Sequence, residues 1–183
     1  DEAVPIVTLT GKAGCGKTLL AIAVGLEQVL EQRKYKKLVV SRPVQPLGKD
    51  IGYLPGTIEE KMRPWLMPIQ DNIDFLMNGQ KNNMSMFFED GTIQIEALTY
   101  IRGRSISNAF VIIDEAQNLT THELKTIITR VGENTKVVLT GDVEQIDNVY
   151  LDATSNGLSY AVEKFKLHDL AGHVTLVKGE RSK

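Results

Sequence analysis

The 183-residue sequence has one cysteine, one tryptophan and three histidines, and its charges nearly cancel to a net −2. A single cysteine excludes an internal disulfide and any metal centre built from several thiolates, and the histidine positions suggest no zinc site. No run approaches the roughly 18 apolar residues that a membrane-spanning helix needs, so we expect no membrane partner. The nearly balanced charge provides no overall basic field, so binding of nucleic acid would need a local cluster of cations.

The amino-terminal residues DEAVP have neither an initiator methionine nor the basic and apolar segments of a signal peptide. They predict a cytoplasmic protein or a fragment of one. The length fits one domain with a full hydrophobic core, so we expect residues 1–183 to form a single domain. A stretch at about 45–91 interrupts the pattern of the remaining chain, and we interpret it as an insertion into that domain.

Short β-branched runs alternate with helical patterns along the chain, which is typical of a doubly wound α/β fold with a mainly parallel sheet flanked by helices. Pro64 and Pro68 predict breaks or kinks in one helix, Thr120 or Thr121 is expected to cap another, and residues 78–91 indicate a loop or hairpin. The expected strands are 5–10, 37–43, 93–98, 110–116, 136–142 and 173–177, and the expected helices are 17–32, 57–77, 121–131 and 154–166.

The segment GKAGCGKT at 11–18 joins the first expected strand to the first expected helix. Its spacing is that of the phosphate-binding loop, in which glycines let backbone amides approach an anion at a helix amino terminus. Lys17 would reach the β- and γ-phosphates, and the hydroxyl of Thr18 would ligate magnesium. A plain glycine-rich turn is the alternative, but the motif positions and both flanks favour nucleotide binding. The residues expected to contact the nucleotide are Gly11, Lys12, Ala13, Gly14, Cys15, Gly16, Lys17, Thr18 and Leu19.

Two later apolar runs end in polar residues that suit nucleotide hydrolysis. FVIIDEAQ at 110–117 ends in an acidic pair, and the carboxyl ends of parallel strands share one edge of the sheet with the loop. Asp114 suits contact with magnesium, and Glu115 suits orienting or deprotonating the attacking water. Gln145, which follows the run ending in Gly-Asp, has an amide that can donate to a γ-phosphate and accept from water. An acidic helix cap and an ordinary polar turn are the structural alternatives.

Together these residues carry a family resemblance over essentially the whole chain. GKAGCGKT, VIIDEAQ and TGDVEQID, with SRP at 41–43, GYLPG at 52–56, YIRGRS at 100–105 and VKGERSK at 177–183, resemble the PhoH-like ATPase family. DEAQ and GDxxQ also resemble motifs of the first core domain of superfamily-one helicases. The resemblance implies a RecA-like, three-layer P-loop fold, hydrolysis of ATP with Mg²⁺, and a ring-shaped homo-oligomer such as a hexamer. VKGERSK resembles the branch whose ATPase follows a PIN ribonuclease domain, which implies RNA unwinding or remodelling.

An arginine at the γ-phosphate accelerates nucleotide hydrolysis by roughly 10³ to 10⁵. Superfamily-one helicases take this arginine from a second core domain, which this chain does not contain. We therefore expect a neighbouring subunit to supply it, with Arg181 ranked first and Arg104 second. Arg42, Arg102 and Arg104 are also candidates for contacts with nucleic-acid phosphates, although a structural ion pair explains such arginines equally well.

Two further functions fit the same motifs. One is a nucleotide-gated switch or scaffold without helicase activity, and the other is a small-molecule kinase. The kinase is disfavoured by DEAQ, because a base for water is unnecessary when a substrate hydroxyl accepts the phosphoryl group. Stimulation of ATP hydrolysis by single-stranded RNA would distinguish a motor from a switch.

Overall fold

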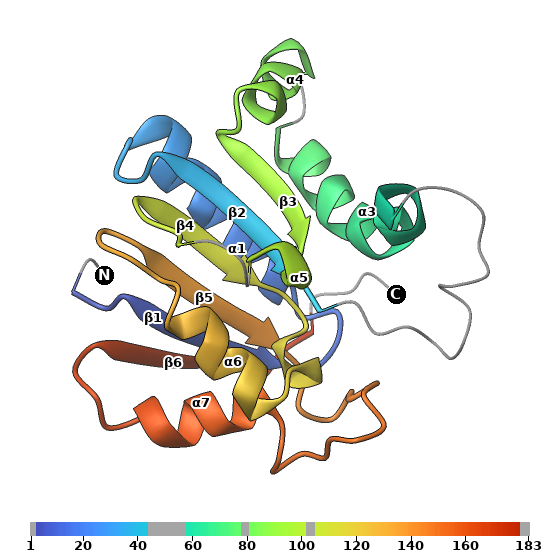
Figure 1. Cartoon of the computed structure of the whole chain (residues 1–183), viewed down its shortest axis with the longest axis vertical. Coiled ribbons are helices and arrows are strands. Elements are labelled where there is room, and N and C mark those ends of the chain that lie inside the picture. Colours follow the sequence, from blue (N-terminus) through green and yellow to red (C-terminus); the bar gives the residue numbers. More distant parts are fainter. Residues whose placement is uncertain (1–2, 44–57, 78–80, 102–104, 180–183) are drawn as a thin grey trace.

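The computed structural model of the chain describes residues 3–43, 58–77, 81–101 and 105–179. Six strands form one sheet in the order β3-β2-β4-β5-β1-β6, and each neighbouring pair is parallel. Helices cover both faces of this sheet (Figure 1), which confirms the predicted three-layer α/β fold. The strands are β1 (Ile6–Gly11), β2 (Lys37–Arg42), β3 (Ile93–Ala97), β4 (Ala109–Ile113), β5 (Lys136–Gly141) and β6 (Ala171–Leu176).

The helices divide between the two faces of the sheet. On one face lie α1 (Lys17–Leu26), which continues into a π-helical turn at Glu27–Glu31, α3 (Ile58–Leu76) and α4 (Lys81–Glu89). On the other face lie α5 (Leu98–Ile101), α6 (Thr121–Ile128) and α7 (Gly157–Phe165), with a 3-10 turn at Ala116–Asn118. Figure 1 shows α6 and α7 in front of the sheet and α1 behind it.

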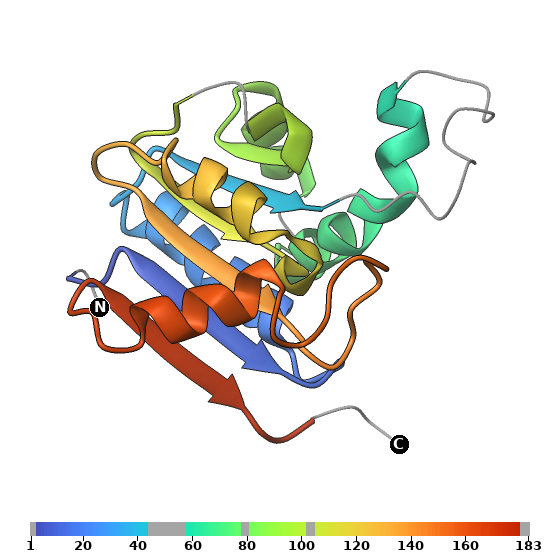
Figure 2. The same cartoon turned by 60° about the horizontal axis from the view of Figure 1, so that its bottom comes forward.

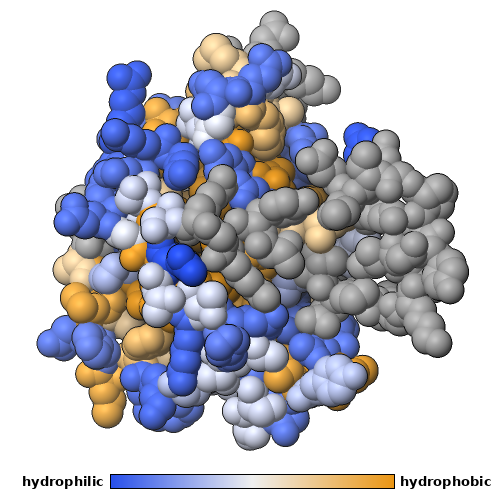
Figure 3. Space-filling model, viewed as in Figure 1, coloured by the Kyte–Doolittle hydropathy of each residue, from blue (hydrophilic) through white to orange (hydrophobic). Residues whose placement is uncertain are grey.

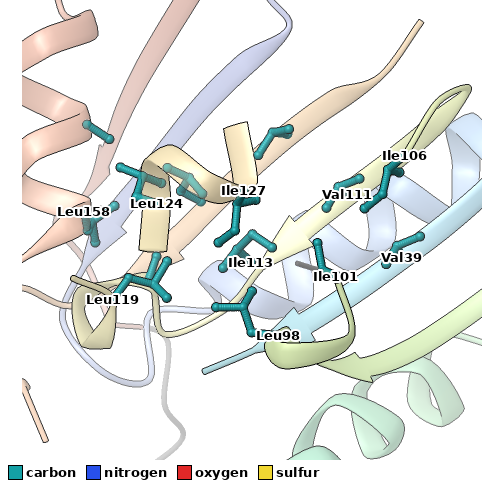
Figure 4. Packing of buried hydrophobic residues seen from close by; sticks show 14 of the residues in the cluster. Val39, Leu98, Ile101, Ile106, Val111, Ile113, Leu119, Leu124, Ile127 and Leu158 are labelled. Carbon is teal, nitrogen blue, oxygen red and sulfur yellow. The ribbon is translucent and has the colours of Figure 1, made fainter. Parts of the chain in front are cut away.

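A separate hydrophobic cluster fills each face. Ile22 of α1 and Ile73 of α3 are buried with Phe110 on one face. On the opposite face, Ile113 of β4 packs in a cluster with Ile127 of α6, as Figure 4 shows. Every residue of β4 and β5 is buried, because these central strands are covered on both sides. Burial of each such aliphatic side chain contributes about 1.5–3 kcal/mol to stability. The two clusters therefore fix the central strands, whose carboxyl ends form one edge of the sheet.

The expectation of a loop or hairpin at 78–91 is wrong, because Lys81–Glu89 forms helix α4. Met84, Phe87 and Phe88 are partly buried against the cluster on the α1 face. Their spacing of three and four residues places the three side chains on one side of a helix. This apolar stripe decides the local structure, although the surrounding residues are polar.

Helix α3 runs through both of its prolines without ending. Pro64 and Pro68 are exposed, whereas Ile69, Ile73 and Met77 are buried against the α1 face at helical spacing. The buried stripe stabilises a helix that the prolines alone would weaken. Figure 2 shows that α3 changes direction along its length, as a proline-containing helix is expected to do.

Helix α6 begins with a capping box, so the expected cap falls on the first of the two threonines. The hydroxyl of Thr120 accepts a hydrogen bond from the amide of Glu123 at 3.1 Å, and the amide of Thr120 donates to the carboxylate of Glu123 at 2.9 Å. These two bonds satisfy amides that the first turn of a helix leaves without partners. The helix ends at Ile128, three residues before the expected end at residue 131.

Helix α7 begins at Gly157, three residues after the expected start at residue 154. Asn156 caps it by accepting from the amide of Ser159 at 2.9 Å. Before the cap, the carboxylate of Asp152 accepts hydrogen bonds from the hydroxyl and amide of Thr154 and from the amide of Ser155. These bonds hold the chain in a turn and lower the pKa of Asp152 to about 2.

The coloured part of the face in Figure 3 is mostly hydrophilic, with smaller hydrophobic areas between the hydrophilic residues. Within the described ranges, no helix has the length and apolar content to cross a membrane. Residues 44–57 and 102–104, which include GYLPG and two of the candidate arginines, lie outside those ranges.

The capping box of α6 gives a direct test of local stability. Thr120→Ala removes the side-chain acceptor, so we expect the free energy of unfolding to fall by about 1 kcal/mol, measured by urea denaturation. Thr121→Ala is the matched control, with an expected change within about 0.5 kcal/mol. Equal losses in the two variants would contradict the assignment of the cap to Thr120.

Candidate functional site

The candidate site lies at the carboxyl edge of the sheet. All strands are parallel, so the residues that follow β1, β4 and β5 leave the sheet at the same edge (Figures 1 and 2). Strand β5 lies between the other two, which places its last residues between the phosphate loop after β1 and the acidic pair after β4. This is the edge at which open α/β sheets bind ligands.

The phosphate loop takes a backbone path that requires glycine at two positions. Gly11 has φ 154°, and a Cβ there would lie 2.6 Å from the carbonyl oxygen of Leu176 in the adjacent strand. Gly16 caps α1 in the left-handed conformation, with φ 83°. Among the described residues, nothing beyond its chain neighbours lies within 4 Å of a Cβ built at Gly16, so the left-handed backbone rather than crowding favours glycine there.

Lys17 lies inside the loop rather than on its surface. The side chain is only 8% exposed, and its Nζ donates hydrogen bonds to the carbonyl oxygens of Gly11 at 2.7 Å and Lys12 at 2.9 Å. The ammonium therefore connects the end of the loop to its beginning, and the loop curls around the Lys17 side chain. Polyphosphate oxygens would be stronger acceptors for this charge than the two neutral carbonyls.

The hydroxyl of Thr18 donates to Oδ1 of Asp114 at 2.7 Å, which joins the start of α1 to the end of β4. Thr140 of β5 donates to the same oxygen at 2.6 Å, and the amide of Asp114 donates to the carbonyl of Ser41 at 2.8 Å. Thr18 and Asp114, which the sequence nominated separately as magnesium contacts, are therefore in direct contact, and Asp114 is only 4% exposed.

The donor set at Thr18 and Asp114 fits magnesium. Both side chains offer oxygen, which is the ligand that Mg²⁺ prefers, and they are in direct contact. In the described part of the chain, no group of three or more His, Cys, Asp and Glu side chains is arranged to hold a metal. Two protein oxygens would leave the other positions around Mg²⁺ to nucleotide phosphates and water, as is usual for this ion.

Glu115 stands beside this pair in a conformation that few residues adopt. Its φ of 53° and ψ of 39° are left-handed, and they turn the chain sharply after β4. Oε1 of Glu115 forms an ion pair with Nη2 of Arg42 at 3.0 Å, and Oε2 accepts from Nε2 of Gln117. Arg42 was a candidate for nucleic-acid contact, and the structure places it in the alternative arrangement, an ion pair.

Gln117 is fully buried and connects three parts of the site. Besides contacting Glu115, its Nε2 donates to the carbonyl of Gln145 at 2.9 Å, and its Oε1 accepts from the amide of Asp142 at 3.2 Å. Gly141 is required here, because a Cβ at this position would collide with Oε1 of Gln117. Gln117 thus holds the turn after β5 against the turn after β4.

Asp142 completes the connection to the phosphate loop. Its Oδ2 accepts from the amide of Ala13 at 2.9 Å, and its Oδ1 accepts from the amide of Glu144 at 3.0 Å. A continuous set of hydrogen bonds therefore runs from Ala13 through Asp142 and Gln117 to Glu115.

Sequence reasoning missed the roles of Asp142, Gln117 and Thr140. Their positions at or just after the ends of β4 and β5 were the available signal, since that edge was already expected to carry the site. Gln145 has an exposed side chain, and its main chain joins the network, so its role as a γ-phosphate sensor stays a prediction. Arg181 lies outside the described residues, as Arg102 and Arg104 do.

The remaining loop residues differ in exposure. Lys12 and Ala13 are exposed, Cys15 is buried, and Leu19 lies in the first turn of α1. The ammonium of Lys12 is 3.8 Å from the carboxylate of Glu144, between two side chains that are mostly exposed. Such a pair contributes little to stability, so Lys12 is available to a ligand at the mouth of the loop.

Comparison with known proteins identifies the family of the chain. The family described as "PhoH-like protein" matches residues 2–181. "Protein PhoH2" of Bacillus subtilis (strain 168) is 61% identical over 183 residues, which are 99% of this chain and 41% of that protein. "Protein PhoH" of Escherichia coli (strain K12) is 36% identical over 177 residues, which are 97% of this chain and 49% of that protein. The chain thus spans less than half the length of these curated relatives.

Solved structures resemble the chain only weakly, at low sequence identity. The Sulfolobus solfataricus SWI2/SNF2 ATPase core in complex with dsDNA covers 92% of this chain, and 40% of that chain is aligned, with 17% identity and a TM-score of 0.43. The family match is far more specific, because it extends over nearly the whole sequence and the relatives are more than 30% identical. It confirms the resemblance found in the motifs: the chain belongs to the PhoH-like protein family.

Proposed function

We propose that this chain hydrolyses ATP with the help of magnesium, at the site between the phosphate loop and the end of β4. The contact of 2.7 Å between Thr18 and Asp114 carries this proposal, because it brings the loop and the acidic strand end together as hydrolysis requires. Membership of the PhoH-like family supports nucleotide binding by the loop. The choice of ATP and the hydrolysis itself are the parts that experiment must test.

Each residue of the site has a distinct role in this proposal. The amides of the loop and the ammonium of Lys17 bind the phosphates, for which Lys17 exchanges its bonds to the carbonyls of Gly11 and Lys12. Thr18 and Asp114 hold the cation, which when bound neutralises charge on the phosphate oxygens. Glu115 orients a water molecule and accepts its proton, so the chain itself provides the base for hydrolysis.

We further propose that the ATPase acts on RNA as a ring-shaped homo-oligomer in which Arg181 of one subunit reaches the nucleotide of the next. The motif resemblance supports this part of the proposal. A PIN ribonuclease domain in the complete protein would account for relatives that are more than twice as long as this chain. A nucleotide-gated switch without unwinding activity is the competing function, and it predicts that RNA leaves the hydrolysis rate unchanged.

Two substitutions separate binding from chemistry. Lys17→Ala should abolish ATP binding, measured by fluorescence of a labelled nucleotide, because the phosphates lose their only buried cation among the described loop residues.

Glu115→Gln should keep ATP binding and lower the rate of phosphate release by roughly 10² to 10⁴, since it removes the general base.

Lys166→Ala is the control for these variants, because Lys166 lies at the far end of α7 and pairs only weakly with Glu163. We expect it to bind and hydrolyse ATP like the parent chain. Unchanged ATP affinity in Lys17→Ala, or an unchanged rate in Glu115→Gln, would refute the assigned roles.

Assembly can be tested through concentration and mixing. If the arginine acts between subunits, the ATPase rate per chain should rise with protein concentration. An inactive Arg181→Ala chain mixed with an inactive Glu115→Gln chain should recover part of the activity, because some subunit pairs then combine an intact arginine with an intact base. A mixture no more active than its separate components would show that the arginine does not act in trans.

A further inference from the structure

The carboxylate of Glu115 is engaged at both oxygens in the structure. Oε1 faces the guanidinium of Arg42 at 3.0 Å, and Oε2 accepts from Gln117. A water molecule that gives its proton to Glu115 must therefore displace or share one of these donors. Gln117 is buried and held by two further bonds, so Arg42 is the donor that can leave.

Arg42 is placed to reach both Glu115 and a ligand from solvent. It ends β2, which pairs directly with β4, and Ser41 and Ile113 are partners in that pairing. The side chain of Arg42 is 22% exposed and that of Glu115 is 31% exposed, so the ion pair is partly open to solvent. Solvent screening weakens such a pair, so a phosphate ligand can compete for the guanidinium.

A second contact connects Arg42 to the inserted region. Nη1 of Arg42 is 3.4 Å from the carbonyl oxygen of Trp65 in α3. The guanidinium thus lies between helix α3, which is part of the inserted region, and the residue that we assign as the base. If Arg42 changed partner, Oε1 of Glu115 would lose its hydrogen bond, while Gln117 would still hold Oε2.

We propose that Arg42 is a positioning residue that restrains Glu115 until a phosphodiester of single-stranded RNA takes over its guanidinium. A guanidinium matches two phosphate oxygens in a planar, bidentate geometry, so an RNA phosphate is a competitive partner for the charge. Once Arg42 has changed partner, Oε1 of Glu115 faces the attacking water. This inference rests on the proposed hydrolysis at the same site, and it explains how RNA would regulate it.

The proposal assigns Arg42 two states with different partners, and RNA binds only one of them. A ligand shifts such an equilibrium by its difference in affinity for the two states. Arg42 makes no described bond to the phosphate loop, whose contacts run instead through Ala13, Lys17 and Thr18. Release of Glu115 should therefore raise kcat and leave the KM for ATP nearly unchanged.

The test is Arg42→Gln, which keeps a polar side chain and removes the positive charge. Without RNA, its kcat should be several-fold higher than that of the parent chain, with an unchanged KM for ATP. Oligouridylate should stimulate the parent chain and have almost no further effect on the variant. The slope of log affinity for oligouridylate against log salt concentration should also become shallower by about 0.7, the loss of one phosphate contact.

Two more variants keep the test decisive. Arg33→Gln, at the opposite edge of the sheet before β2, removes an exposed arginine and should behave like the parent chain. Arg42→Lys keeps the charge but not the planar fork, so its RNA-free kcat should lie between those of the parent and Arg42→Gln. Arg42→Lys also provides the measurement if Arg42→Gln does not fold.

An RNA-free kcat of Arg42→Gln or Arg42→Lys that is equal to or below that of the parent would overturn the proposal. Equal stimulation of Arg42→Gln and the parent by oligouridylate would also overturn it. Failure of the hydrolysis proposal has a different signature, since the parent chain itself would then release no phosphate, or Lys17→Ala would release as much as the parent.

Discussion

The structure of the site depends on one buried carboxylate, that of Asp114. It accepts from Thr18 at the start of α1 and from Thr140 at the end of β5, while its amide donates to β2. Burying a carboxylate without partners costs several kcal/mol, so these hydrogen bonds make the position tolerable. They also connect the ends of β2, β4 and β5 with the start of α1. A cation bound at this position would contact a carboxylate that these bonds already hold in place.

Around this carboxylate, binding and chemistry are assigned to different residues but are physically connected. Gln117 holds Glu115, the carbonyl of Gln145 and the amide of Asp142, and Asp142 in turn holds the loop at Ala13. Low local dielectric strengthens such a buried network and makes each missing bond costly. The position of the Glu115 carboxylate is therefore connected to the phosphate loop through Gln117 and Asp142.

Errors in the sequence-based boundaries were small wherever a motif or a cap determined them. The strand ends differ by one to three residues from expectation, which leaves Asp114 and Asp142 at the correct edge. The main error was α4, where Met84, Phe87 and Phe88 fold as a helix only because the α1 face offers them a hydrophobic surface. The sequence prediction gave more weight to the polar composition of the segment than to this short apolar pattern. In the folded chain, packing of the apolar side chains favours the helix.

The sequence by itself determined the phosphate loop, the order of the strands along the chain, and the placement of Thr18 and Asp114 at the same edge of the sheet. The loop could be predicted because its residues are contiguous in the sequence. The shared edge could be predicted because the carboxyl ends of parallel strands always lie at the same edge of a sheet. Only the tertiary structure decided the partner of Arg42, which lies 73 positions from Glu115 and meets it through the pairing of β2 with β4. The same holds for Gln117, because the conformation of three separate turns sets which atoms a buried amide can reach.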